Sequence, residues 1–218
     1  ARLVDTGGYI GKALYDAGVS TVDLDPVLEM AARSSDARER NLAHGLIISM
    51  FRDRKEPWAV ELIGRARRNA WGAEALMTIL RAMPASRWTW DQVAAIGGDF
   101  QVAYWRGAPV FWIDEDIDAV CYAIRQLIDV GRARHALALV GRRSKGVRLP
   151  SPLLIEVLEQ AAKQPFDRAD DGNEATMFQH YVAETLSELD SRDDVDRQVL
   201  AMLEWNYVRV LEYSRRPA

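Results

Sequence analysis

Residues 114–143, DEDIDAVCYAIRQLIDVGRARHALALVGRR, set the pattern for the rest of the chain. Aliphatic side chains recur there at the three- and four-residue spacing of one helix face, at Ile117, Val120, Ile124, Leu127 and Ile128. Acidic residues crowd the start of this segment, where the helix dipole favours them, and Gly131 follows its end. The segment RARHALALVGRR that comes next predicts a second helix, antiparallel to the first and joined to it by a short turn.

Most of the remaining sequence has the same helical pattern. Asp25 with Pro26, and Ser151 with Pro152, predict a capping residue followed by a first-turn proline, and Thr89 is a third capping candidate. The other predicted helices cover residues 9–18, 23–35, 36–54, 56–70, 72–83, 89–98, 99–107, 151–164, 171–190 and 194–214. One run alone, APVFWID at residues 108–114, has strand character, and a single run cannot form a sheet. We therefore expect an all-α fold, an irregular α-solenoid of stacked antiparallel helix pairs with about ten or eleven helices.

The glycine-rich stretch VDTGGYIGKALYDAG, residues 4–18, raises the question of a phosphate-binding loop. Such a loop in nucleotide-hydrolysing proteins needs G-x-x-x-x-G-K-[S/T] between a buried strand and a helix. Here residues 8–10 alone separate Gly7 from Gly11, and Ala13 stands where a hydroxyl should reach the magnesium ion. We therefore expect a turn that leads into a helix ending at Gly18 rather than a nucleotide site.

Composition is that of an ordinary globular protein. The chain has 218 residues, 49% of them hydrophobic and 28% charged, which suffices for one large domain or two small ones. The net charge of -4 argues against a general polyanion-binding protein. Cys121 is the single cysteine, so no internal disulfide can form and a reducing, cytoplasmic compartment is expected. No apolar run is long enough for a membrane span and no leader pattern is present, so we expect neither membrane insertion nor secretion.

The predicted helices fall into two arrays, residues 1–106 and 107–218, of one continuous unit. The break at 106–114 combines glycine and proline with the strand-like run, which makes it the best internal boundary. The connector QPFDRADDGNEA, residues 164–175, is the most polar, and we expect it to be a mobile loop. Helical patterns adjoin both ends of the sequence, so we expect a fragment of a longer protein.

No group of side chains predicts a metal centre, a cofactor site or a catalytic site. His44, His135 and His180 fall in different predicted helices, and Glu184 alone follows His180 at a helical spacing, whereas zinc needs three or four ligands. Cys121 lies on an apolar face, as expected of a small core residue rather than a nucleophile. The acidic runs at 114–118 and 190–194 are explained better by helix starts than by metal binding.

Aromatic residues gather in residues 87–112, which hold four of the seven tryptophans. Large rings can anchor short irregular helices in a core, and tryptophan and tyrosine are also typical of partner-binding surfaces. We therefore take this segment as core with a candidate partner-binding site at Trp88, Trp90, Tyr104 and Trp105.

Basic residues cluster near predicted helix ends. The arginines and lysines there also complement the helix dipole, and charge runs are usually solvated surface. If the clusters lined up along one edge, they would form a nucleic-acid-binding ridge despite the negative net charge. The residues of this alternative are Arg65, Arg67, Arg68, Arg142, Arg143, Lys145 and Arg148.

Three stretches, MPASRWTWDQVAAIGGDFQVAYWRG (83–107), AIRQLIDVGRARHALALV (123–140) and VLAMLEWNYVRVLEYSRRP (199–217), carry a resemblance. They resemble the helical-repeat (TPR/HEAT-like) region of very large, mostly uncharacterised bacterial multidomain proteins, over residues 75–218. The resemblance implies a cytoplasmic bacterial scaffold or sensor region, with any enzymatic domain elsewhere in the longer protein. It carries over no catalytic residue.

The leading interpretation is therefore a non-catalytic scaffold that presents a helical surface to a protein partner or to neighbouring domains of the same chain. One alternative is a nucleic-acid-binding module, which requires its basic groups on one face. Another is an all-α enzyme, which requires a concave pocket with perturbed titratable groups. A scaffold instead should expose an apolar or aromatic patch.

Overall fold

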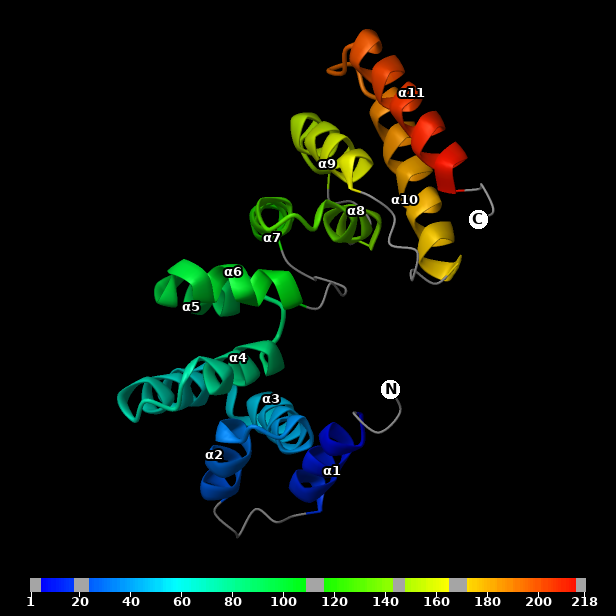
Figure 1. Cartoon of the computed structure of the whole chain (residues 1–218). Helices are drawn as coiled ribbons and strands as arrows, with labels where there is room; N and C mark the ends of the chain where they lie inside the picture. The colour runs from blue at the N-terminus through cyan, green and yellow to red at the C-terminus, as the bar shows by residue number, and fades with distance from the viewer. Residues whose placement is uncertain (1–4, 18–23, 109–115, 143–147, 165–171, 215–218) are drawn as a thin grey trace. The chain divides into compact units, whose positions relative to one another are not determined.

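The computed structural model describes residues 5–17, 24–108, 116–142, 148–164 and 172–214, and these form eleven helices and no strand (Figure 1). The predicted all-α class is therefore confirmed. The chain divides into two compact units, Ala1–Tyr104 and Trp105–Ala218, whereas the sequence placed the boundary after Arg106. Most of the strand-like run at 108–114 lies outside the described residues.

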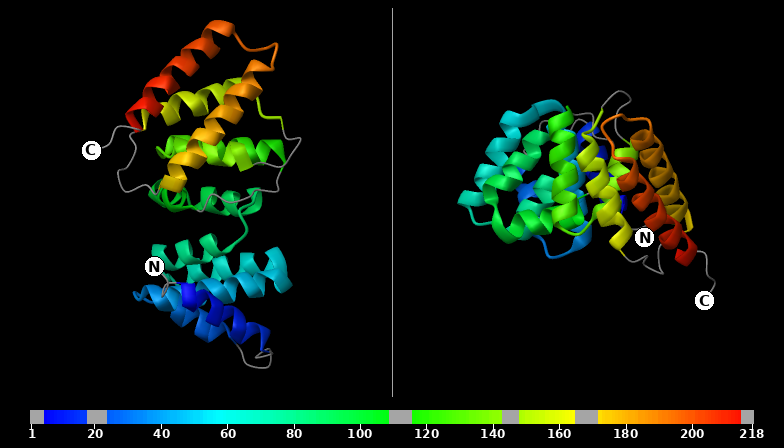
Figure 2. Two further views of the ribbon diagram at one scale, coloured as in Figure 1. Left: turned by 90° about the vertical axis from the view of Figure 1, so that its right-hand side faces the viewer. Right: turned by 90° about the horizontal axis from the view of Figure 1, so that it is seen from above.

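Unit 1 is built around α3 (Ala37–Arg68), which contacts α1 (Asp5–Asp16), α2 (Asp25–Arg33) and α4 (Ala73–Ala82) (Figure 2). The chain continues from α4 into α5 (Arg87–Ile96) and α6 (Gly98–Gly107), which runs across the unit boundary. Burial of one large aliphatic side chain contributes about 1.5–3 kcal/mol, so the core formed by α2, α3 and α4 holds these helices together. Its fully buried members include Leu28, Leu46, Ile47, Met50, Leu62, Ile79 and Leu80.

The long helix α3 consists of two helical segments. Lys55 has φ 59° and ψ -163°, which interrupts the helical geometry two residues before Pro57. A proline has no N–H to donate, so it fits the first turn of the second segment, where that donor would have no partner. The sequence predicted separate helices at 36–54 and 56–70, and the backbone at Lys55 confirms this break.

The glycine-rich stretch lies in α1. This helix begins at Asp5, so Gly7 and Gly8 are helical, and the turn predicted before residue 9 is wrong. Gly11 lies within a helix, as predicted. A Cβ atom on Gly11 would lie 2.5 Å from the carbonyl oxygen of Leu42 and 2.8 Å from the amide nitrogen of Leu46. The missing side chain therefore allows the backbones of α1 and α3 to approach closely, which is a packing role for the glycine.

After the end of α6, unit 2 continues with the helix pair that the sequence predicted. The helices α7 (Ile117–Asp129) and α8 (Ala133–Arg142) contact each other across a short turn at Gly131, which has φ 76°. The next helix, α9 (Ser151–Lys163), packs on α8. The predicted antiparallel pair is therefore confirmed.

The last two helices of unit 2 are α10 (Gly172–Asp190) and α11 (Arg197–Ser214), which run side by side (Figures 1 and 2). The helix α10 starts within the connector predicted at 164–175, whose residues 165–171 lie outside the described residues. The Tyr207 hydroxyl of α11 donates a hydrogen bond of 2.7 Å to the Leu158 carbonyl of α9. Burial raises the pKa of Tyr207 well above its ordinary value, so this donor keeps its proton.

Two predicted caps are wrong because their side chains have distant partners. Asp25 is the first residue of α2 rather than its cap, and its carboxylate forms an ion pair of 2.9 Å with Arg65 of α3. Ser151 is the first residue of α9, and its hydroxyl accepts a hydrogen bond of 2.8 Å from buried Arg192. Each side chain connects two elements of the same unit and does not cap the N-terminus of its own helix.

Near Thr89 the cap lies one turn earlier than predicted. Ser86 is the N-cap of α5, and its hydroxyl accepts a hydrogen bond of 3.4 Å from the Thr89 amide. At α7 the acidic start has the expected role, because Asp116 caps the helix by accepting from the Ala119 amide at 2.8 Å.

Candidate interaction surface

The aromatic segment is mostly buried. Trp90 exposes 2%, Tyr104 3% and Trp105 3% of its surface. Burial also raises the pKa of Tyr104 to about 12, so its hydroxyl keeps its proton at neutral pH. Trp88 is half-buried, and its ring centre lies 6.1 Å from that of Phe51. The structure therefore corrects the expectation of a partner-binding surface at Trp90, Tyr104 and Trp105, which are core residues. A role for Trp88 stays a prediction.

The basic residues of unit 1 have different surroundings. Arg65 is half-buried, and its guanidinium forms the ion pair with Asp25 described above. Arg67 and Arg68 are exposed in the last turn of α3, where positive charge complements the helix dipole. One of the three candidate nucleic-acid ligands in this unit is therefore already engaged in the fold.

The basic residues of unit 2 are also divided. Arg142 donates from Nε to the Tyr181 hydroxyl at 2.9 Å, and its guanidinium lies 5.8 Å from the centre of that ring. Arg148 is exposed. Arg143 and Lys145 lie outside the described residues. A single basic ridge stays a prediction, because its members belong to two units.

Several other arginines donate hydrogen bonds to backbone carbonyl groups. Arg132 donates to the carbonyls of Trp105 and Ala108, both at 2.8 Å, and buried Arg192 donates to the Leu149 carbonyl at 2.7 Å. Trp105 and Ala108 lie at the end of α6, where carbonyls lack intrahelical partners, and Leu149 lies outside the helices, before α9. These bonds therefore satisfy carbonyl groups that would otherwise be costly to bury. Similar bonds to carbonyl oxygens are made by Arg40, Arg81 and Arg134. Sequence reasoning missed this role because, except for Arg40, each of these arginines has its partner remote in the chain.

Cys121 is a buried free cysteine, which confirms the predicted core position. Burial raises the pKa of its thiol, so the reactive thiolate is scarce at neutral pH. Burial also lowers the pKa of His44 and favours its neutral form. His180 pairs with Glu184 at 3.3 Å, and His135 is exposed. The described residues contain no group of three or more His, Cys, Asp or Glu side chains that could hold a metal ion.

The acidic run at 190–194 does not start a helix, so that prediction is wrong. The run covers the end of α10 and the turn before α11, and the residue that caps α11 follows it. That residue is Asp196, whose carboxylate accepts a hydrogen bond of 2.7 Å from the Gln198 amide. Asp190 forms an ion pair with Arg197.

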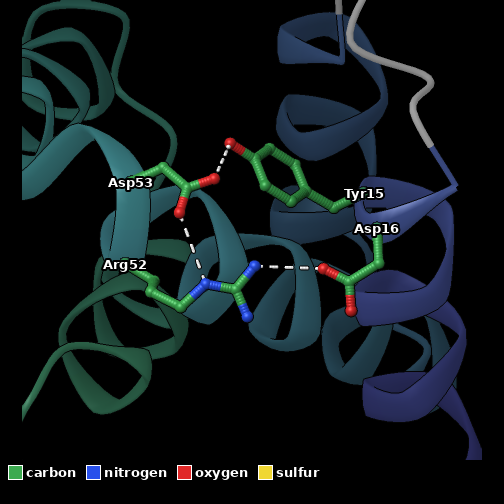
Figure 3. Close-up of polar contacts among 4 residues, drawn as sticks. All are labelled: Tyr15, Asp16, Arg52 and Asp53. Carbon is green, nitrogen blue, oxygen red and sulfur yellow. Dashed lines mark hydrogen bonds and ion pairs between the residues drawn. The ribbon is translucent and has the colours of Figure 1, made fainter.

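A polar network joins the end of α1 to the first segment of α3 (Figure 3). The Tyr15 hydroxyl donates to Asp53 at 2.7 Å, and Arg52 contacts Asp53 at 3.3 Å and Asp16 at 3.0 Å. The bond from Tyr15 lowers the pKa of Asp53, and the same bond raises the pKa of Tyr15. A general acid or base works best with a pKa near neutral pH, and both of these pKa values are shifted away from neutrality. The network therefore connects two helices and is poorly suited to acid–base catalysis.

An open groove of about 670 Å³ lies at the end of α2 and the start of α3. Within it Arg33 and Glu29 pair with each other at 3.1 Å. These two charges therefore partly neutralise each other. The groove is lined by Pro26, Glu29, Met30, Arg33, Ser34, Ser35 and Glu39.

The helix α11 is apolar on two opposite faces. One face packs into unit 2 through Leu200, Leu203 and Tyr207. The other face, here named the α11 outer face, consists of three large apolar side chains that remain open to solvent. Their exposed fractions are 53% for Met202, 64% for Trp205 and 48% for Val208. A helix that is apolar on both faces is normally covered on both, so the α11 outer face is a candidate interaction surface.

A second exposed apolar face lies on α1 in unit 1, at Tyr9, Ile10 and Leu14. It lacks tryptophan, the residue type most enriched among the side chains that dominate binding energy. We therefore rank the α11 outer face first. Sequence reasoning missed Trp205 because the apolar pattern of one helix does not show which of its faces another helix covers.

Comparisons with protein-family models, with curated protein sequences and with solved structures find no match to this chain. Among the helices that the structure describes, none is both long and apolar enough to span a lipid bilayer.

Proposed function

We propose that this chain is a non-catalytic helical interaction region that binds another protein through the α11 outer face. The observation that carries the proposal is the exposure of Trp205 between Met202 and Val208 on a helix whose opposite side is already packed. Tryptophan surrounded by smaller apolar contacts is typical of the centre of a protein–protein interface.

The surroundings of the titratable groups support a non-catalytic role. The Cys121 thiol is buried with a raised pKa, and the Tyr15–Asp53 network is occupied in joining two helices. The proposal places the region in the cytoplasm, as part of a larger bacterial protein, in keeping with the single reduced cysteine and with the resemblance described above. Two candidate residues of the nucleic-acid alternative are already engaged within the fold, Arg65 with Asp25 and Arg142 with Tyr181, which does not favour that alternative.

Site-specific photo-crosslinking tests this proposal. A photoreactive benzophenone amino acid is placed at position 205 of the protein, which is expressed in the native host cells. The matched control carries the same amino acid at Val60, an exposed apolar position of α3. We expect a protein adduct from position 205 and none from position 60. Equal adducts at both positions, or none at position 205, would contradict the proposal.

A further inference from the structure

The helix α1 adds little to the core of unit 1. Tyr9, Ile10 and Leu14 remain 73%, 49% and 37% exposed, and Tyr15 is half-buried. The other residues of α1 are acidic residues, lysine, threonine, glycine and alanine, so none has a large apolar side chain. The shorter helix α2, by contrast, buries Leu28. Since the burial of large apolar side chains is the main source of packing energy, α1 gains less from packing than α2 does.

The sequence of α1 also gives this helix little stability of its own. It has 12 residues, and an isolated helix of that length is marginal in water even when it is rich in alanine. Three of the residues are Gly7, Gly8 and Gly11, and glycine is the poorest helix former after proline. Asp16 places a negative charge at the negative end of the helix dipole. A copy of α1 that leaves α3 should therefore unfold.

Two kinds of described contact hold α1 on α3. At Gly11 the two backbones approach closely, beside Leu42 and Leu46. At the end of α1 the polar network of Figure 3 joins the last two residues of the helix to α3. Arg52 is central to this network, because its guanidinium contacts one carboxylate of each helix. Its side chain is 55% exposed, so these ion pairs are weak and are screened by salt.

We infer that α1 is a strap that opens and closes over α3 while the core formed by α2, α3 and α4 stays folded, and that the network around Arg52 is its latch. Elements with few buried apolar contacts and exposed polar contacts are those that open locally. Opening uncovers the turn of α3 from Leu42 to Leu46, in which Gly45 and Leu46 are buried. The strap therefore controls whether this face of α3 is accessible. The inference goes beyond the proposed function and does not depend on the α11 outer face.

Hydrogen exchange followed by mass spectrometry tests the opening in the whole chain. The amides of α1 should exchange at least about tenfold faster than those of α2 and α4, and more slowly than in an unfolded peptide. Arg52→Gln removes both ion pairs and should accelerate exchange in α1 about two- to tenfold, with α2 and α4 unchanged. Higher ionic strength should accelerate exchange in α1 of the wild-type chain and have little effect in the variant. The matched control Arg87→Gln breaks an exposed ion pair within α5 and should leave α1 unchanged.

Thiol labelling tests the uncovering of α3. Ser49 is buried, and it lies on the helix face of Leu42 and Leu46, between the contact at Gly11 and the latch. Ser49→Cys, combined with Cys121→Ser to remove the native thiol, therefore places a probe beneath α1. Iodoacetamide should label this thiol faster when Arg52→Gln is added, by the same factor as the exchange of α1.

The inference is overturned if α1 exchanges at the rate of α2 and α4, because α1 would then be an integral part of the core. Exchange of α1 at the rate of an unfolded peptide would also overturn it, since such a helix does not close on α3. An Arg52→Gln variant in which exchange in α1, α2 and α4 accelerates equally, or in which labelling at position 49 does not change, would exclude a separate opening of α1.

Discussion

Replacing Ala70 with glycine should stabilise unit 1. The helix α3 ends in a Schellman motif, in which the Ala70 amide donates to the Arg67 carbonyl at 3.3 Å and the Trp71 amide donates to the Ala66 carbonyl at 3.0 Å. This arrangement requires φ 49° at Ala70. In that left-handed region a Cβ atom crowds the backbone, whereas glycine adopts it freely.

The end of α7 provides a matched control with the opposite residue. Its motif has the same pair of bonds, from the Gly131 amide to the Ile128 carbonyl at 2.9 Å and from the Arg132 amide to the Leu127 carbonyl at 2.7 Å. Gly131 has φ 76°, and a Cβ atom there would have no other heavy atom within 4 Å. The cost of Gly131→Ala is therefore conformational and includes no steric clash.

The magnitude follows from two opposing terms. The left-handed conformation costs an L-residue roughly 1–2 kcal/mol. Glycine loses roughly 0.5–1 kcal/mol more backbone entropy than alanine when the chain folds. Ala70→Gly should therefore raise the free energy of unfolding by about 1 kcal/mol, and Gly131→Ala should lower it by about the same amount.

Equilibrium urea unfolding followed by far-ultraviolet circular dichroism measures both changes, and amide exchange at Trp71 and Arg132 locates them. The midpoint should shift while the slope with urea stays the same. The reasoning is refuted if Ala70→Gly destabilises the protein, or if Gly131→Ala has no effect.

Three further predictions concern single side chains. Lys55→Gly should raise the free energy of unfolding by about 1 kcal/mol, because the backbone conformation at Lys55 is essentially restricted to glycine. Lys55→Ala keeps the backbone strain, so an equal rise in the free energy of unfolding for both variants, measured by urea unfolding, would contradict this reasoning. Gly11→Ala should lower the free energy of unfolding by about 1–3 kcal/mol, because the added Cβ would contact the Leu42 carbonyl. Gly64→Ala should not destabilise the protein, because its Cβ would contact only a flexible arginine side chain. Equal urea unfolding midpoints for the two variants would refute the close contact at Gly11. Cys121 should react slowly with iodoacetamide at pH 7 and faster in urea, because burial raises its pKa; fast labelling of the native chain, read by mass spectrometry, would exclude the buried thiol.

Elements with a strong local pattern could be predicted from the sequence. The α7–α8 pair followed from its apolar spacing and from Gly131, and the break in α3 followed from Pro57. These features depend on hydrogen bonds and dihedral angles within a few residues, so the local sequence contains the information. The caps at Asp25 and Ser151 were mispredicted because their partners, Arg65 and Arg192, are remote in the chain.

The candidate surface could not be predicted in the same way. Trp90 and Trp205 both lie in helices among apolar neighbours, yet Trp90 is buried and Trp205 is exposed. The difference depends on which helices cover each ring. No periodicity within one helix distinguishes the face that packs into unit 2 from the face that does not.

The sequence by itself determined the all-α class, the pairing of neighbouring helices and the places where helices break, because those depend on local backbone energetics. The tertiary structure alone decided which aromatic rings are covered, which arginines hold carbonyl groups, and that Gly11 lies against α3. The physical reason is that burial and long-range hydrogen bonds are properties of two or more elements packed together, and such properties exist only once the chain has folded.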